Sequence, residues 1–151
     1  MKYIFLLFIF FITSAIADDD CIFDVDAQKE IAQEYIQKNK DAQSGKSDIE
    51  IVLSRENETI NFSRGGCDSF EISVVSTSNR SYSQQEFFDK SITLIEEFAK
   101  EIVDIKMLKE AISNKRWEEF EGRYFINIDM ATIVELSYEI EGRVYIAASF
   151  Q

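Results

Sequence analysis

Apolar and polar residues alternate in six short stretches of the chain, arranged as two groups of three. Such alternation is typical of half-buried β-strands, because successive side chains of a strand point to opposite faces. A helical pattern, with apolar residues at three- and four-residue spacing, precedes each group. We therefore expect an α+β fold of two helix-plus-three-strand units, with antiparallel sheet or sheets and helices packed on one face. The predicted strands lie within residues 49–53, 60–62, 70–74, 124–130, 132–138 and 144–150.

The first helical pattern follows an acidic leader. Its apolar residues recur from Ala27 to Ile36, and either Asp24 or Asp26 could cap its N-terminus by accepting free backbone N–H groups. Gly45 is a natural end for the segment, because glycine readily adopts the conformation that follows a helix. We therefore expect one amphipathic helix before the first three strands.

The second helical pattern begins with a capping box. Ser83 and Glu86 have the spacing at which each side chain accepts a backbone N–H from the other residue. A wide apolar face follows over residues 87–103, and helical spacing continues to residue 115. The sequence leaves open whether this is one long helix or two helices broken near Asp104.

The order of elements indicates two similar halves, residues 19–77 and 83–151, within a single small domain of residues 18–151. It leaves open whether the strands form one sheet or two. Two-layer inhibitor proteins built from helix-plus-meander repeats have a similar outline. That likeness concerns architecture alone, and architecture does not carry function.

Residues 1–17, MKYIFLLFIFFITSAIA, have the parts of a secretion signal peptide. Lys2 supplies the positive start, an apolar run follows, and Ala15 and Ala17 are the small residues that a signal peptidase requires. The alternative is a membrane anchor, which needs about 20 apolar residues to span a bilayer, more than this run provides. We expect a cleaved signal and a periplasmic or secreted mature chain of 134 residues.

The mature chain is strongly acidic. The signal contains one of the 16 basic residues and none of the 28 acidic ones, so the remainder has a net charge of −13. Such a surface repels nucleic acid and anionic lipid and attracts basic proteins or cations. The alternative is that the charge serves only to keep an exported protein soluble. We expect a basic protein partner and no stable membrane insertion after signal cleavage.

The chain contains no histidine and no proline. Histidine is the commonest general base, activator of nucleophiles and ligand of transition metals, so its absence removes most catalytic and metal-binding chemistry. Phosphate-binding and dinucleotide-binding motifs are also missing from the sequence. We expect no cofactor and no metal site.

The two cysteines, Cys21 and Cys67, predict a disulfide. An exported chain with an even number of cysteines favours this pairing, which closes a loop of about 46 residues and contributes about 4 kcal/mol in the chain-entropy model. The alternatives are a nucleophilic Cys67, which lacks an adjacent base, and a metal site, which lacks further ligands. Gly65 and Gly66 are expected to form a turn or bulge that another segment approaches closely.

Carboxylates offer the remaining route to catalysis. Glu118 and Glu119, beside Trp117, and Asp129 within a predicted strand are candidates for a hydrolase pair. With 28 acidic residues, such neighbours are expected by chance. The aspartates of DDDCIFDVD could also bind calcium, although the EF-hand glycine is absent. We expect a non-enzymatic protein.

Strand alternation places aromatic and charged residues on a second sheet face. Phe125 and Tyr145 occupy positions opposite to those of the apolar core residues, together with Arg143 and Glu135. Aromatic residues beside arginine are typical of binding hot spots. The alternative is a second layer of helix covering this face. We expect these four residues to contribute to a binding surface.

Together these features predict an exported acidic protein that binds another protein. An inhibitor or immunity-type role against a basic envelope enzyme or toxin fits best. The alternatives are an interaction or assembly module without inhibitory role, and a carboxylate-dependent hydrolase.

Overall fold

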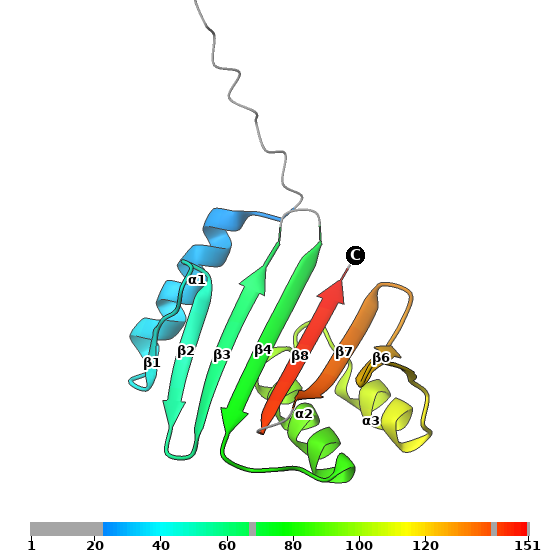
Figure 1. The fold of residues 1–151 in the computed structure, drawn as a ribbon. Coiled ribbons are helices and arrows are strands. Elements are labelled where there is room, and N and C mark those ends of the chain that lie inside the picture. Colours follow the sequence, from blue (N-terminus) through cyan, green and yellow to red (C-terminus); the bar gives the residue numbers. More distant parts are fainter. Residues whose placement is uncertain (1–22, 67–68, 140–141, 151) are drawn as a thin grey trace, which may run out of the picture.

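The described residues, 23–66, 69–139 and 142–150 of a computed structural model, form three helices and one antiparallel sheet of eight strands (Figure 1). The mixed α+β class predicted from the sequence is therefore confirmed. The elements are α1 (Val25–Lys38), β1 (Ala42–Ser44), β2 (Glu50–Arg55), β3 (Glu58–Gly65), β4 (Phe70–Ser78), α2 (Gln84–Phe98), α3 (Ile105–Ser113), β5 (Glu118–Phe120), β6 (Arg123–Asn127), β7 (Thr132–Glu139) and β8 (Arg143–Phe150).

The sheet consists of two four-stranded meanders that meet in its middle. The spatial order is β1-β2-β3-β4-β8-β7-β6-β5, so β4 and β8, the last strands of the two halves, pair with each other. Their register runs over eight residue pairs, from Phe70 opposite Phe150 to Thr77 opposite Arg143. Backbone hydrogen bonds across this central seam join the halves into one sheet, which answers the question the sequence left open.

The prediction of three strands per unit was wrong, because each half has four. The additional strands, β1 and β5, are three residues long and have the sequences AQS and EEF. Three polar or mixed residues are too few to show the alternation that identifies a strand, so the sequence did not indicate β1 or β5. A second error concerns Met130, which lies in the bend between β6 and β7 and is fully exposed.

The predicted helix starts are confirmed. The Asp24 carboxylate accepts the backbone N–H groups of Asp26 and Ala27, each at 3.0 Å, and so caps α1. Ser83 and Glu86 form the reciprocal capping box of α2. The apolar stretch after α2 does contain a break, since Asp104 caps a separate helix, α3. Helix α1 ends at Lys38, with Asn39 as its C-cap, well before Gly45.

The core forms from one side of every long strand. Ile51, Phe62, Val74, Ile146 and Leu136 lie opposite one another across five neighbouring strands, and all are buried. The same apolar cluster includes residues of the helices: Ala32, Phe87, Phe88, Leu94, Ile95, Phe98, Leu108 and Ala111.

Aromatic rings connect helices to strands within this cluster. The Phe62 ring of β3 lies 5.0 Å from that of Phe98 in α2 and 6.3 Å from that of Tyr35 in α1. On the C-terminal half, the Phe87 ring of α2 lies 5.9 Å from Tyr138 of β7. Each ring pair buries apolar area from a helix and a strand together, which is the principal source of stability at such contacts.

Several sequence predictions fall outside the described residues. These include the signal peptide of residues 1–17 and both cysteines of the predicted disulfide, Cys21 and Cys67. Among the helices that are described, none is long and apolar enough to cross a membrane.

Candidate protein-binding face

The side chains that alternate with the core residues form what we call the outer face of the sheet. One row across this face runs from Asn61 through Val75, Tyr145 and Ser137 to Arg123. The next row consists of Ser63, Ser73, Ala147, Glu135, Phe125 and Glu118. Hydroxyl groups dominate the part formed by β3 and β4, whereas aromatic and charged groups gather on β6, β7 and β8.

The structure brings together three of the four residues predicted for binding. Phe125 of β6 lies directly opposite Glu135 of β7, and Tyr145 of β8 lies opposite Ser137 on the same strand as Glu135. All three are half-buried. Arg143 is exposed and lies two residues along β8 from Tyr145, where it faces Thr77 of β4. The strand alternation therefore places all four on one face, while their role in binding stays a prediction.

A hollow of about 450 Å³ lies beside Tyr145 on this face. Glu121, Arg123, Glu135, Ser137 and Tyr145 contribute to its lining, together with Gly122 and Tyr138. The turn between β5 and β6 forms one wall, where Glu121 and Gly122 have φ angles of 50° and 77°. Two consecutive positive φ angles are typical of tight hairpin turns, and the glycine makes the second one favourable.

Sequence reasoning missed Glu121, Arg123 and Ser137 as members of this site. The repeated motif EGR, at Glu121–Arg123 and again before Val144, does signal a hairpin with an exposed arginine. The signal is local, however, and the register of β6 against β7 is needed to show that Arg123 reaches Glu135. Arg123 Nη1 lies 3.2 Å from Glu135 Oε1.

Tyr145 lies in an acidic setting. Burial raises the pKa of the Tyr145 phenol above its usual value, and the nearby carboxylates of Glu71 and Glu135 raise it further. A hydrogen bond with Ser73 and the charge of Arg123 act in the opposite direction. The hydroxyl consequently stays protonated at neutral pH and can donate a hydrogen bond to a carboxylate or a ligand.

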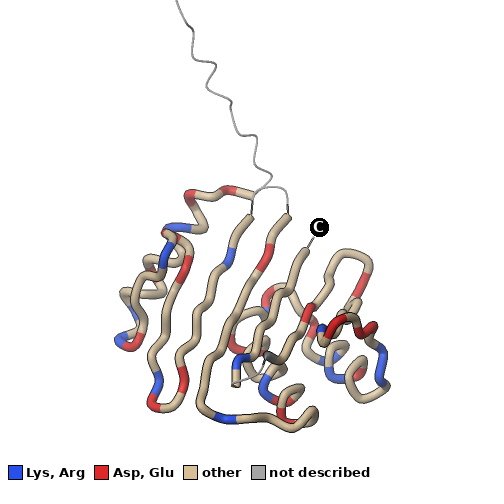
Figure 2. The backbone as a smooth tube through the Cα atoms, in the orientation of Figure 1, with Lys and Arg blue, Asp and Glu red and all other residues tan. Residues whose placement is uncertain are grey.

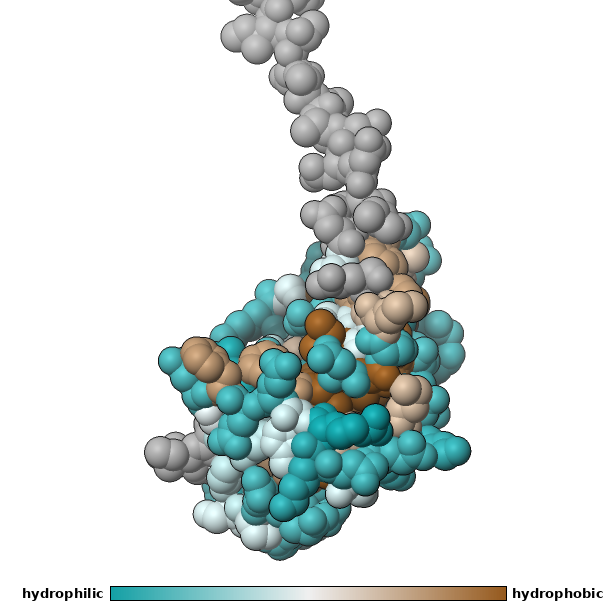
Figure 3. Space-filling model, turned by 90° about the vertical axis from the view of Figure 1, so that its right-hand side faces the viewer, coloured by the Kyte–Doolittle hydropathy of each residue, from teal (hydrophilic) through white to brown (hydrophobic). Residues whose placement is uncertain are grey.

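Exposed large apolar side chains concentrate in the C-terminal half. Phe120, Met130, Ile133 and Phe150 are all exposed there. Ile133 lies on the outer face, whereas Phe150, opposite Thr132, lies on the other face of the sheet. Figure 3 shows the right-hand side of the molecule in Figure 1, where apolar residues gather between hydrophilic neighbours. Of the exposed large apolar residues on β7 and β8, only Ile133 is therefore placed by the strand register on the outer face.

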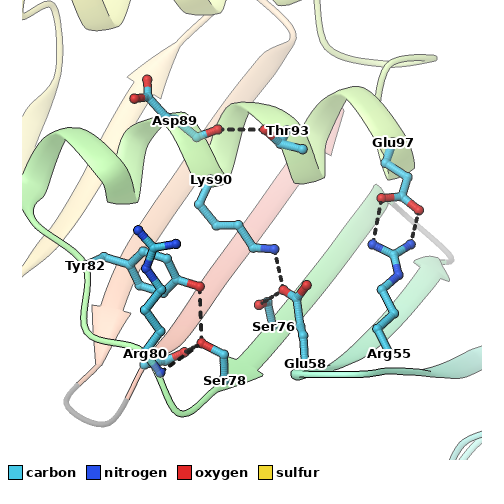
Figure 4. Close-up of polar contacts among 11 residues, drawn as sticks. Arg55, Glu58, Ser76, Ser78, Arg80, Tyr82, Asp89, Lys90, Thr93 and Glu97 are labelled. Atoms are coloured by element: carbon cyan, nitrogen blue, oxygen red, sulfur yellow. Dashed lines mark hydrogen bonds and ion pairs between the residues drawn. The ribbon is translucent and has the colours of Figure 1, made fainter.

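A second polar constellation connects α2 to strands β2 and β3 (Figure 4). Glu58 of β3 forms an ion pair with Lys90 of α2 and accepts a hydrogen bond from the buried Ser76 hydroxyl. Arg55 of β2 binds both carboxylate oxygens of Glu97. We call these the helix-side ion pairs. Their groups satisfy one another, which indicates a structural role.

Charge is distributed unevenly over the fold. Figure 2 shows acidic and basic residues on the helices and at the turns, while the central strands β3, β4 and β8 carry few charges. The outer face has few charged groups, among them the acids Glu71 and Glu135 and the cations Arg123 and Arg143.

The candidate catalytic carboxylates are not arranged as a pair. Glu118 and Glu119 are consecutive in β5, so their side chains point to opposite faces of the sheet. The prediction that Asp129 lies within a strand was wrong. It lies in the turn after β6, where its carboxylate accepts the backbone N–H groups of Ala131 and Thr132, each at 2.8 Å. These hydrogen bonds hold the pKa of Asp129 below its usual value.

Metal binding has no visible candidate in the part of the chain that is described. No group of three or more acidic side chains there is placed to hold an ion. Two aspartates of the acidic leader contact groups of helix α1 instead, since Asp24 caps α1 and Asp26 forms an ion pair with Lys29.

Comparisons with protein-family models, with curated proteins and with solved structures find no match to this chain.

Proposed function

We propose that this chain is an exported, acidic, non-enzymatic protein that binds another protein through the outer face of its sheet. The observation that carries the proposal is the grouping of half-buried Phe125 and Tyr145 with Glu135 on that face. We further infer that the helices pack on the opposite face only. The helix–strand ring contacts of Tyr35, Phe87 and Phe98 support this inference, since their strand partners point into the core.

The chemistry of the outer face suits recognition of a protein. Tyrosine and arginine are enriched in binding hot spots because they combine a large contact area with hydrogen bonds. A sheet also holds the backbone beneath these side chains in place, so little backbone entropy is lost when a partner covers them. Removing the half-buried Phe125 and Tyr145 from water would supply the apolar part of the binding free energy.

The partner we propose is a basic protein. A net charge of −12 on the full chain, or −13 without the predicted signal, speeds encounter with a positively charged surface. An inhibitor or immunity-type role against a basic envelope enzyme or toxin follows if the partner's active site is what the outer face covers. The mechanism would be steric occlusion, with the acids guiding the approach.

The proposed function requires export, and export would expose the chain to conditions in which the predicted disulfide between Cys21 and Cys67 can form. Described residues near the two cysteines lie together. The ring of Phe23 is 5.6 Å from that of Phe70, and the Gln28 side chain accepts from Gly66 N–H at 3.1 Å and donates to Gly66 C=O at 3.3 Å. This anchors the start of α1 beside the end of β3, so the disulfide would reinforce an existing contact.

The glycines at this contact have a defined use. Gly65 and Gly66 have φ angles of 153° and 148°, which side chains rarely adopt. A Cβ atom at Gly65 would lie 2.2 Å from Gln28 Oε1, so the close approach predicted from the sequence is made by α1. Mass spectrometry of the exported protein without reductant tests the disulfide. Two alkylatable thiols would exclude it.

The binding function is tested by capture of a partner and by its dependence on the outer face. The mature chain is used as bait against an envelope extract at low and high salt. A Phe125→Ala/Tyr145→Ala variant should lose the captured protein. A matched control, Ile31→Ala/Met107→Ala, removes two exposed apolar side chains from helices and should retain it.

The outcomes separate the proposal from its alternatives. Loss of capture in the outer-face variant alone, with weakened capture at high salt, supports binding to a basic partner. Inhibition of the captured protein's activity would assign an inhibitor role, and its absence would favour an interaction or assembly module. Equal capture by both variants and the unmodified chain contradicts the proposed surface.

A further inference from the structure

We propose that the hollow beside Tyr145 is a subsite for one lysine or arginine side chain of the bound partner. The subsite is formed by Glu135 and Tyr145, with Glu121, Arg123 and Ser137 around them. This inference deepens the proposed function and depends on it for the partner, although its ligand chemistry can be tested separately.

The hollow has the size and position that such a subsite needs. Its volume of about 450 Å³ lies within the roughly 300–1,000 Å³ that is typical of ligand pockets, which leaves room for a long cationic side chain. It opens on the outer face, in the same row of residues as Arg123, Ser137 and Tyr145. Phe125 lies directly beside Glu135 and can contact the surface around an inserted side chain.

The charges around the hollow favour a cation. Glu121 and Glu135 line it, and the carboxylate of Glu71 acts on the Tyr145 hydroxyl from the β4 side. Arg123 is the one basic residue among the lining residues, and Arg143 lies outside that lining. Two carboxylates and one cation therefore line the hollow, and the Tyr145 ring adds an aromatic surface of the kind over which ammonium and guanidinium groups bind.

The contact between Arg123 and Glu135 leaves capacity for a second cation. It joins one nitrogen to one oxygen at 3.2 Å, and the Arg123 side chain is 56 % exposed against 22 % for Glu135. The pair of Arg55 and Glu97, in contrast, uses both carboxylate oxygens. An incoming guanidinium can therefore bind Glu135 beside Arg123, or it can displace Arg123. Displacement costs little, because it breaks an ion pair whose arginine is exposed.

The experiment measures binding of a blocked amino acid by NMR titration of the full mature protein. The probes are N-acetyl-arginine amide, N-acetyl-lysine amide and, as a neutral isostere of arginine, N-acetyl-citrulline amide. Saturable shifts at Arg123, Glu135 and Tyr145 are expected with both cationic probes. Citrulline should bind roughly tenfold more weakly, because it lacks the charge that strengthens hydrogen bonds to a carboxylate.

Two variants make the test specific. Glu135→Gln should weaken arginine binding roughly tenfold, since it replaces the charged acceptor by a neutral one. Glu56→Gln removes the same charge from the exposed turn between β2 and β3 and should leave binding unchanged. Three results would overturn the subsite. The arginine and citrulline probes could bind with equal affinity, Glu135→Gln could bind the arginine probe as tightly as the unmodified protein, or N-acetyl-aspartate amide could bind more tightly than the arginine probe.

Failure of the subsite is distinguishable from failure of the proposed function. If Phe125→Ala/Tyr145→Ala abolishes partner capture but no cationic probe binds, the binding face stands and the subsite is wrong. If the cationic probes bind at Glu135 but partner capture is insensitive to every outer-face variant, the subsite stands and the proposed function is wrong.

Discussion

Two ion-pair regions of the sheet differ in how much water reaches them. Lys90 and Glu58, on the helix side, have side chains 20 % and 15 % exposed, and the buried Ser76 hydroxyl completes their contacts. Arg123 and Glu135, on the outer face, form a single 3.2 Å contact with an arginine that is more than half exposed. The first region is a closed network that joins α2 to β3. The second retains the capacity to bind a further group.

This difference indicates which region stabilises the fold and which one is available for binding. A largely buried charge is costly once its partner is removed, so the pair of Lys90 and Glu58 should matter for stability. An exposed pair contributes little to stability, so its residues can serve recognition without weakening the fold. Substitutions in the two regions should therefore affect different measurements.

The largest expected effect is on the helix side. Lys90→Met keeps the apolar stem of the side chain but leaves the Glu58 carboxylate without its cation, and should lower the free energy of unfolding by about 2–3 kcal/mol. Chemical denaturation measures this. Lys109→Met is the control, because its pair with Glu96 is about half exposed and should cost less than about 1 kcal/mol. Equal losses in the free energy of unfolding for the two variants would contradict a structural role for the contacts of Glu58.

On the outer face, the largest effect should be on binding. Tyr145→Ala should weaken binding of the captured partner by about 2 kcal/mol, or roughly 30-fold in Kd, as expected for a hot-spot tyrosine. Tyr145→Phe retains the ring and should lose much less. Calorimetric titration with the purified partner distinguishes the two variants, and an undiminished affinity of Tyr145→Ala would exclude this residue from the interface.

The capping box of α2 should have an intermediate effect on stability. Ser83→Ala removes the hydroxyl that accepts the Glu86 N–H and should cost about 1 kcal/mol in the free energy of unfolding. Because the box lies at a helix start and away from the outer face, partner affinity should not change. Chemical denaturation and partner binding, measured on the same sample, test the expected loss of stability and the expected unchanged affinity. A loss of affinity would contradict the expectation that the capping box and the outer face act independently.

The same capping box predicts a pH dependence. Hydrogen bonds from the Ser83 backbone, the Ser83 hydroxyl and Arg80 lower the pKa of Glu86 from 4.5 to about 2. Since the folded-state pKa lies below the unfolded one, the stabilisation is fully present above pH 4.5 and is lost as the pH falls toward 2. Thermal unfolding of the unmodified chain and of Glu86→Gln should therefore differ near neutral pH and converge in acid. A difference that persists in acid would assign the effect to another contact.

The smallest expected effect concerns the stability of the outer-face pair. Glu135→Gln should change the free energy of unfolding by less than about 0.5 kcal/mol, because the ion pair it breaks is exposed on the arginine side. Chemical denaturation measures this, next to the loss of cation binding in the same variant. A destabilisation comparable to that of Lys90→Met would show that this pair is also structural.

The sequence predicted those parts of the fold that depend on local patterns. The caps at Asp24 and Ser83 and the long strands follow from residues close to one another in the chain, whereas the sequence left the break at Asp104 open. The short strands β1 and β5 were missed because three residues are too few for a period. The central pairing of β4 with β8 joins residues more than 65 positions apart, and no local pattern specifies it.

The candidate site was predictable to a similar degree. Alternation within β6, β7 and β8 is enough to place Phe125, Glu135 and Tyr145 on one face. It cannot show that the register puts Arg123 beside Glu135, or that the turn at Glu121 walls a hollow, because both depend on how separate strands align.

The most direct test of the outer face as the binding surface is hydroxyl-radical footprinting of the captured complex. This measurement reports the solvent exposure of individual side chains, and we expect protection of Phe125 and Tyr145 with unchanged oxidation of Met107 on α3. Protection of Met107 with no change at Phe125 and Tyr145 would place the partner on the helices and exclude the outer face as the binding surface.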